Sequence, residues 1–259
     1  MTIHPSSIVD PAARLGAGVR IGPFCVIGPD VTLGDGVEVK SHAVVTGWTD
    51  VGADTVIFPH ATVGEVPQDL KYRGERTRLI IGARCKIRES VTLNTGTEGG
   101  GGVTQVGDDC LLMTGAHVGH DARLGNRVIL ANGVAIAGHC QIGDDVIVGG
   151  LSGIHQWVRI GQGAIIGAVT MVTNDVIPYG LVQGPRGELD GLNLVGLKRR
   201  GLDRAAITAL RHAYEALAKG EGTFLDRARH LAETGETDEV RAMAGFILSG
   251  SDRSFLTPK

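Results

Sequence analysis

The sequence predicts a mainly β protein, a three-sided parallel β-solenoid followed by a small C-terminal α-helical domain. The first observation behind this prediction is an aliphatic residue at every sixth position, a period that is neither the 3.6 of an α-helix nor the alternation of an ordinary strand. The second is that this period ends after Pro178 and gives way to helical spacing. The repeat positions are Ile3, Val9, Leu15, Ile21, Ile27, Leu33, Val39, Val45, Val51, Ile57, Val63, Ile81, Ile87 and Leu93, then, after one slip, Val106, Leu112, Val118, Leu124, Leu130, Ile136, Ile142, Val148, Ile154, Ile160, Ile166 and Val172.

Short strands closed into a triangle give about 18 residues per turn, so residues 18 apart stack at roughly the 4.8 Å inter-strand spacing. The composition agrees, with 40 glycines and only 4% aromatic residues. A chain that turns a corner every six residues needs positions free of Cβ hindrance, and Gly16, Gly22 and Gly28 each follow a repeat aliphatic. We therefore expect the coil to span residues 1–189.

The four cysteines share one place in the repeat. Cys25, Cys85, Cys110 and Cys140 each lie two residues before a repeat aliphatic, where other turns carry small residues such as Ala116. Cysteine fills such an inward slot as a small hydrophobe. We interpret all four as packing residues rather than as disulfides or a metal site.

The residues directly before the repeat aliphatics form three outward stripes. One is apolar, one is polar and one is small. They consist of Leu111, Ile129, Ile147 and Ile165, of Gln105, Arg123, Gln141 and Arg159, and of His117, Ala135, Gly153 and Met171. An exposed apolar stripe on a rigid prism is best explained by burial against another subunit, and a three-sided prism suggests a cyclic homotrimer.

Two segments leave the period, near residues 64–80 and 94–105. In the first, the expected core positions are Asp69 and Glu75, which indicates an extruded loop. The second is rich in glycine, and its run Gly99–Gly102 lacks the strand and helix context of a phosphate-binding loop, so we interpret it as a flexible connector. Loops on a rigid scaffold frequently carry function.

Residues 190–259 predict a small helical domain. Leu210, Ala213 and Leu217 share one helical face between a cap at Asp203 and Gly220, and Leu202 directly before the cap continues that face. Two further helices are expected over residues 224–232 and 237–248. A helical domain at this place would cap the open end of the solenoid.

Charge and hydropathy exclude several classes of partner. The net charge is −3 and there is no long run of like charge, so neither nucleic acid nor an anionic membrane surface is indicated. The chain has no apolar run of about 18 residues and no signal-peptide pattern over Met1–Asp10. We expect no integral membrane segment and a cytoplasmic location.

Winding the chain at about 18 residues per turn collects histidines on one patch. Histidine titrates near neutrality and can act as a general base toward a hydroxyl, and a neighbouring carboxylate can fix its tautomer. Gly138 would expose an unhindered backbone N–H, a group that can bind a developing oxyanion. The patch consists of His117, His120, Asp121, Gly138, His139, His155 and Gln156.

Several stretches resemble the hexapeptide-repeat acyltransferases, which fold as a left-handed parallel β-helix. Within them, the chain closely resembles the acyl-carrier-protein:UDP-N-acetylglucosamine O-acyltransferase family, which starts lipid A biosynthesis. The resemblance spans essentially the whole chain. The matching stretches are IGPFCVIGP at 21–29, GEVPQDLKYRGE at 64–75, IRESVTLNTGT at 87–97, GAHVGHD at 115–121, LAN at 130–132, AGH at 137–139, HQW at 155–157 and LNLVGLKRRG at 192–201.

The resemblance implies transfer of an (R)-3-hydroxyacyl group from acyl carrier protein to the 3-hydroxyl of UDP-N-acetylglucosamine, without cofactor or metal. It implies that His120 is the general base, that Asp121 supports it, and that the N–H of Gly138 binds the oxyanion. Ala168 would lie in the acyl slot, at a different corner of the prism from His120, so we expect the slot to form between subunits.

The resemblance also implies a set of substrate-binding residues. The first three of the set belong to the first loop and would bind the sugar nucleotide, and the next four belong to the histidine patch and would line the pocket. The last three would bind the nucleotide and its phosphates, for which the forked donors of arginine are suited. The set consists of Gln68, Asp69, Lys71, His117, His139, His155, Gln156, Asn193, Arg199 and Arg200.

Other functions stay open at this point. Asn94 and Thr95 stand where enterobacterial members commonly have a His-Arg pair, and Val195 replaces an acidic residue, so a 3-amino UDP-sugar is an alternative acceptor. A γ-type carbonic anhydrase uses the same coil with three histidines on zinc. Two features argue against the zinc enzyme. Asp121 directly follows His120, and the chain also carries the residues expected to bind a sugar nucleotide.

Overall fold

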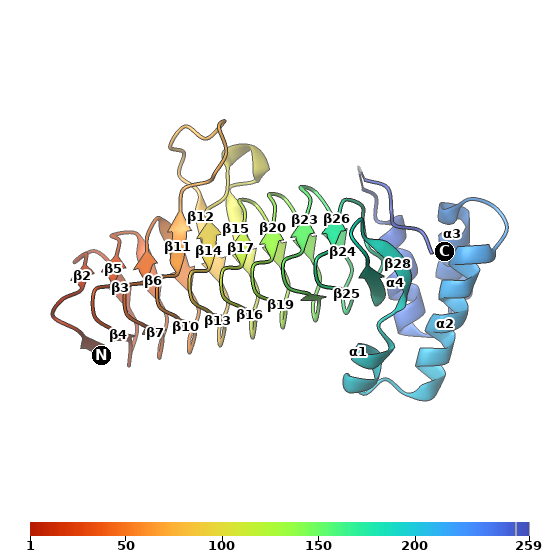
Figure 1. Ribbon diagram of the computed structural model, residues 1–259, viewed down its shortest axis with the longest axis horizontal. Coiled ribbons are helices and arrows are strands. Elements are labelled where there is room, and N and C mark those ends of the chain that lie inside the picture. Colours follow the sequence, from red (N-terminus) through yellow and green to blue (C-terminus); the bar gives the residue numbers. More distant parts are fainter. Residues whose placement is uncertain (252, 259) are drawn as a thin grey trace.

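Three sheets form the sides of a triangular coil in the computed structural model, which describes residues 1–251 and 253–258 (Figure 1). Outside the loops, each strand residue pairs in parallel with the residue one turn onward, as Ile129 does with Ile147. The predicted fold is confirmed: a left-handed parallel β-helix of hexapeptide repeats carries a few helices at its C-terminal end.

We call the three sheets faces A, B and C, in the order in which the chain visits them. Within the described residues, face A has 11 strands. They are β1 (Thr2–Ile3), β4 (Arg20–Ile21), β7 (Glu38–Val39), β10 (Val56–Ile57), β13 (Lys86–Ile87), β16 (Leu111–Leu112), β19 (Ile129–Leu130), β22 (Ile147–Val148), β25 (Ile165–Ile166), β27 (Gly180–Gln183) and β28 (Glu188–Leu192).

Faces B and C have nine and eight strands in the same part of the chain. Face B consists of β2 (Ile8–Val9), β5 (Val26–Ile27), β8 (Val44–Val45), β11 (Thr62–Glu65), β14 (Thr92–Asn94), β17 (His117–Val118), β20 (Ala135–Ile136), β23 (Gly153–Ile154) and β26 (Met171–Val172). Face C consists of β3 (Arg14–Leu15), β6 (Val31–Leu33), β9 (Trp48–Val51), β12 (Arg78–Ile81), β15 (Val103–Val106), β18 (Arg123–Leu124), β21 (Gln141–Ile142) and β24 (Arg159–Ile160).

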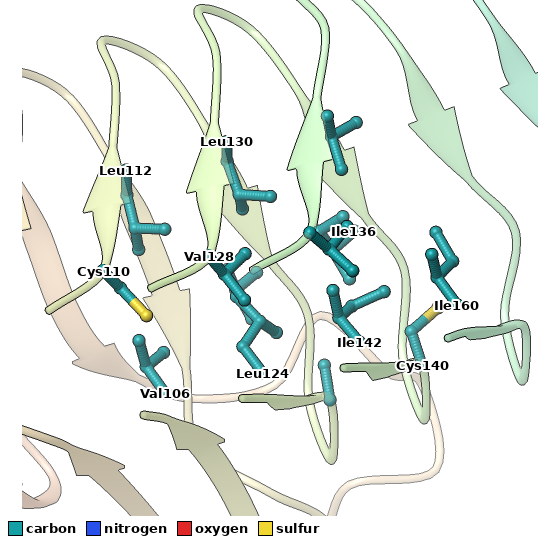
Figure 2. Packing of buried hydrophobic residues seen from close by; sticks show 14 of the residues in the cluster. Val106, Cys110, Leu112, Leu124, Val128, Leu130, Ile136, Cys140, Ile142 and Ile160 are labelled. Carbon is teal, nitrogen blue, oxygen red and sulfur yellow. The ribbon is translucent and has the colours of Figure 1, made fainter. Parts of the chain in front are cut away.

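The repeat aliphatics fill the inside of the coil. Leu112, Leu130 and Ile136 are completely buried and stack on their neighbours from turn to turn (Figure 2). The packing slot predicted for cysteine is confirmed, because all four cysteines are buried free thiols. Burial raises the pKa of the Cys140 thiol to about 12, so it stays protonated and inert at neutral pH.

Glycine is needed in the coil where the backbones of successive turns come close together. A Cβ on Gly34 would lie 2.9 Å from the backbone nitrogen of Ala53 on the next turn, so this position requires close approach of two backbones. The left-handed backbone positions at the corners are frequently not glycine. Asp121, His139 and Trp157, one turn apart, have φ angles of 60°, 62° and 68°.

Both excursions leave the corner between faces B and C. The first joins β11 to β12, and the second joins β14 to β15 and contains the short 3₁₀ helix η1 (Glu98–Gly100). Figure 1 shows them rising side by side from the coil, which is otherwise regular.

The coil ends in a hairpin that the sequence did not predict. β27 continues face A, and β28 returns antiparallel to it, so the expected boundary at residue 189 falls inside a strand. The helix α1 (Leu194–Arg199), also not predicted, follows. Glycine and proline leave residues 178–191 without a readable period.

Three longer helices complete the end of the molecule. They are α2 (Arg204–Lys219), α3 (Phe224–Thr234) and α4 (Asp238–Leu248). The Asp203 side chain caps α2 and Gly220 ends it, as the sequence predicts. Among the described residues, no helix is long and apolar enough to cross a membrane.

Truncating a repeat aliphatic is expected to be costly. Leu130→Ala would leave a cavity in a fully buried position and is expected to lower the free energy of unfolding by about 2–5 kcal/mol. Chemical denaturation measures the loss, with Gln141→Ala at an exposed outward position as the control. Equal stability of the two variants would contradict the proposed core.

Candidate active site

A groove of about 500 Å³ follows face B at its border with face C. It brings together residues from the first excursion and from five successive strands of face B, β14, β17, β20, β23 and β26, with the residues that follow them. Six of the predicted site residues line it: Gln68, His117, His120, Gly138, His155 and Gln156.

His120 and Asp121 form a buried pair at this corner. Nδ1 of His120 lies 2.8 Å from Oδ2 of Asp121, and the two residues are 7% and 4% exposed. A carboxylate accepts hydrogen bonds, so the His120 proton sits on Nδ1. Nε2 is then the free acceptor of the ring, which is the arrangement a general base requires.

Asp121 is itself held by the second excursion. Thr97 donates its backbone N–H to Oδ1 over 2.9 Å and its hydroxyl to Oδ2 over 2.6 Å. Asp121 in turn donates its backbone N–H to the hydroxyl of Thr104 over 2.7 Å. These contacts hold the carboxylate in place, with Oδ2 directed toward His120.

The glycine-rich run belongs to this support. A Cβ on Gly100 would collide with the carboxylate of Asp121, and Gly96 is similarly close. Within the run Gly99–Gly102, only Gly100 packs directly onto Asp121, whereas a Cβ on Gly99 or Gly102 would meet nothing within 4 Å. The run is therefore a connector that also contributes one packed glycine to the site.

His139 lies one turn beyond His120 and contacts the same carboxylate. Its ring meets the His120 ring edge-on at 4.9 Å and stacks on Trp157 at 3.9 Å with an interplanar angle of 5°. Its Nδ1 lies 3.8 Å from Oδ2 of Asp121. Burial lowers the pKa of His139 despite the opposing pull of Asp121, which favours a neutral ring beside the base.

His117 lines the groove from β17. Its Nδ1 lies 2.8 Å from the hydroxyl of Thr92. Burial, and secondarily the charge of His120, lowers the pKa of His117, so this ring is also neutral near pH 7. The site thus places two neutral histidines around the His120–Asp121 pair.

Asn94 and Thr95 tie down the base of the first excursion. Asn94 donates its side-chain amide to the carbonyl of Val66 over 2.8 Å, and the N–H of Thr95 donates to the carbonyl of Glu65 over 3.0 Å. Gln68 therefore lies on a loop whose base is fixed. Asn94 also lines the groove itself.

Asp69 and Lys71 follow on the same loop. The backbone N–H of Lys71 donates to Oδ1 of Asp69 over 2.9 Å. This hydrogen bond lowers the pKa of the Asp69 carboxyl, and the charges of His120 and His139 lower it further. Asp69 is thus an anion on the loop that carries Gln68.

The remaining predicted residues do not meet the groove within one chain. Ala168 is exposed at the corner between faces A and B, after β25. Asn193 lies near the corner between faces C and A, where its side chain caps α1 through Gly196 and donates to the carbonyl of Gly163 over 2.9 Å. Arg199 and Arg200 follow at the end of α1, Arg199 exposed and Arg200 over the Tyr179 ring. Within a single chain these residues therefore lie at other corners of the prism than His120.

The zinc alternative can be tested against the spacing of the donors. His120, Asp121 and His139 offer ligand atoms within 4.8 Å of one another, the one such group in the part of the chain that the structure describes. Two ligands of tetrahedral zinc at about 2.0–2.1 Å lie roughly 3.3 Å apart. The 2.8 Å between His120 and Asp121 is instead a hydrogen-bond distance. The donor set fits a proton-handling pair better than a metal site.

Sequence reasoning missed Thr97, Thr104 and Trp157 as parts of the site. Thr97 lies in a stretch that resembles the family, but its contact with Asp121 depends on the path of the second excursion. Trp157 stands in the same column of the coil as His139, which was the available signal.

A triangular coil of hexapeptides with a histidine-lined groove at one corner defines a hexapeptide-repeat transferase. The family model described as bacterial transferase hexapeptide (six repeats) matches residues 2–47 and 104–138. The family model described as Udp N-acetylglucosamine O-acyltransferase, domain 2, matches residues 175–256.

Similar proteins specify the family. A Paracoccus denitrificans protein named Acyl-[acyl-carrier-protein]--UDP-N-acetylglucosamine O-acyltransferase is 67% identical over 203 residues, which cover 78% of this chain and 77% of the relative. A Rickettsia bellii protein of the same name is 52% identical over 255 residues, 98% of this chain and 90% of the relative. The structure of LpxA from Acinetobacter baumannii has a TM-score of 0.95 at 39% identity and covers 99% of this chain and 100% of that one. This chain belongs to the acyl-carrier-protein:UDP-N-acetylglucosamine O-acyltransferase family.

The half-buried His117 is expected to make stability depend on pH. The pKa of His117 is lower in the folded state than its ordinary value of 6.5, so below about pH 6.5 the unfolded chain binds more protons and folding is disfavoured. The melting temperature should fall between pH 7.5 and pH 5.5, and His117→Gln should reduce that fall. His212→Gln, at an exposed position of α2, is the control and should leave the fall unchanged.

Proposed function

We propose that the groove catalyses transfer of an (R)-3-hydroxyacyl group from acyl carrier protein to the 3-hydroxyl of UDP-N-acetylglucosamine, the first step of lipid A biosynthesis. The observation that carries this proposal is the buried His120–Asp121 pair, which leaves Nε2 of His120 as a free base beside the groove. The names of the relatives support the choice of acyl donor and acceptor.

The reaction needs one base and one site for negative charge. Nε2 of His120 takes the proton of the sugar hydroxyl as its oxygen attacks the thioester carbonyl. The new C–O bond forms, the C–S bond breaks, and the thiolate of the carrier protein leaves and takes the proton from His120. The backbone N–H of Gly138 is the proposed donor to the oxyanion of the intermediate.

The acceptor would bind beneath the first excursion. Gln68 lines the groove, and Asp69 and Lys71 follow it on the same loop. We assign these three residues to the sugar nucleotide, with His117, His139, His155 and Gln156 lining the pocket. Because the side chain of Asn94 holds the base of this loop, the identity of this residue bears on the choice between a 3-hydroxyl and a 3-amino acceptor.

A homotrimer would complete the site. The apolar stripe of face A, Leu111, Ile129, Ile147 and Ile165, remains only half-buried in the single chain. Covering it with a second copy would place another corner of the prism beside the groove. That copy would supply Ala168 to the acyl slot and Asn193, Arg199 and Arg200 to the nucleotide. The cytoplasmic location stays a prediction from the sequence.

Turnover of defined substrates tests the proposal. The purified enzyme is assayed with UDP-N-acetylglucosamine, its 3-amino analogue and a series of 3-hydroxyacyl carrier proteins. His120→Ala is expected to lower the rate by roughly 10²–10⁴-fold, the usual contribution of a general base. His42→Ala is the control, because His42 stacks on His60 at another corner.

Full activity of His120→Ala, or no turnover with any substrate pair, would refute the proposal. Dependence of the activity on added zinc, with loss on chelation, would favour the carbonic-anhydrase-like alternative. Preference for the 3-amino analogue would leave the proposed acyl-transfer mechanism in place but identify a 3-amino UDP-sugar as the acceptor.

Gly138→Ala tests the spacing of the base. The added Cβ would lie 2.6 Å from Cε1 of His120 and would force the ring to move. A displacement of about 1 Å is expected to lower the rate by about 10²-fold. Gly99→Ala is the matched control, since its Cβ would meet nothing within 4 Å among the described atoms. An unchanged rate in Gly138→Ala would show that His120 does not need this position.

A further inference from the structure

The segment after α4 returns to the coil and is pinned there by backbone hydrogen bonds. Asp175 donates its N–H to the carbonyl of Ser254 over 3.0 Å, and Leu256 donates to the carbonyl of Asp175 over 2.8 Å. Asp175 is completely buried just after β26. The tail therefore has a defined place beside the last turn of the coil.

Side-chain contacts hold the tail against the rest of the protein in addition to the backbone hydrogen bonds. Phe255 packs against Phe224 and Phe246, with ring centroids 5.7 and 6.1 Å apart. The buried Arg159 lies over the Phe246 and Phe255 rings and forms an ion pair of 2.7 Å with Asp175. Backbone hydrogen bonds to Asp175 and the ring contacts of Phe255 thus hold residues 254–256 against the last turn of the coil.

Because the tail is held there, Arg253 lies beside the groove. Nη2 of Arg253 lies 2.7 Å from Nδ1 of His155, and its Nη1 donates to the carbonyl of Thr173 over 2.9 Å. His155 lines the groove at the border of faces B and C. Arg253 therefore contacts the site from a segment about 100 positions away in the sequence.

The contact determines where the His155 proton lies. A guanidinium has donors only, so Nδ1 of His155 must accept, and the proton of the neutral ring is then on Nε2. The competing partner of Nδ1 is the carbonyl of Gln156 at 3.2 Å, which would need the proton on Nδ1 instead. The shorter contact, with a donor that is always charged, favours Arg253.

We propose that Arg253 is a positioning residue that holds His155 in the tautomer with the proton on Nε2, so that His155 donates a hydrogen bond to a substrate oxygen in the groove. The substrate part of this inference rests on the proposed function. The two histidines then have opposite tautomers: His120 presents a bare Nε2 that removes a proton, and His155 presents an Nε2–H that binds oxygen.

The experiment compares Arg253→Ala and Arg253→Lys with the intact enzyme. The control is Arg229→Ala, which removes an exposed arginine of α3 paired only with Asp226 among the described residues. The ¹⁵N chemical shifts of the His155 ring report the tautomer without substrate. Steady-state kinetics with UDP-N-acetylglucosamine and a 3-hydroxyacyl carrier protein report the effect on binding and turnover.

In Arg253→Ala, the ¹⁵N shifts should lose the pattern of a proton on Nε2, and kcat/KM should fall about fivefold to tenfold, the value of one hydrogen bond. Added guanidinium at low millimolar concentration should restore part of both. Arg253→Lys keeps a donor and should keep the tautomer, and Arg229→Ala should resemble the intact enzyme.

An unchanged His155 tautomer in Arg253→Ala would overturn the proposal. So would a loss of activity that guanidinium does not restore and that follows a lower melting temperature, because that combination indicates a purely structural role for the tail. If the intact enzyme turns over none of the substrates, the proposed function fails, while the ¹⁵N shifts still decide whether Arg253 sets the tautomer.

Discussion

Hydrogen bonding between successive turns of the coil is the constraint on which the rest of the molecule depends. His139 donates its N–H to the carbonyl of His120 over 3.0 Å, and Trp157 donates to the carbonyl of Gly138 over 3.2 Å. These backbone contacts set the distance from His120 to the ring below it and to the glycine beside it. A slip by one residue would exchange inward and outward side chains along a whole turn, so the packed aliphatic core also protects the geometry of the site.

The excursions convert this regular scaffold into a site. A coil alone would leave Asp121 exposed at a corner, where water would compete for its carboxylate. The second excursion covers it with Thr97 and with glycines that admit no side chain, and the first excursion brings Gln68 to the groove. Burial then keeps His139 neutral. The chemistry of the corner follows from loops whose attachment points the coil fixes.

The six-residue period was enough to predict the fold, the cysteine slot and the juxtaposition of His120, Asp121 and Gly138, because each follows from counting turns. The period could not predict contacts made by segments that do not follow the six-residue repeat. Thr97 reaches Asp121 only through the folded path of a glycine-rich loop, and Arg253 reaches His155 only because a cluster of aromatic rings anchors the tail. The hairpin of β27 and β28 was missed because two strands that pair only once leave no periodic pattern in the sequence. The substrate came from family resemblance, since backbone spacing encodes no acceptor.

The central claim is that Asp121 holds His120 with its proton on Nδ1, which leaves Nε2 as the base. The ¹⁵N chemical shifts of the His120 ring in the substrate-free enzyme test it most directly. We predict a protonated Nδ1 and an unprotonated Nε2 at pH 7.5, with loss of this pattern in Asp121→Asn. A proton on Nε2 in the intact enzyme, or the same pattern in both proteins, would contradict the role of this pair.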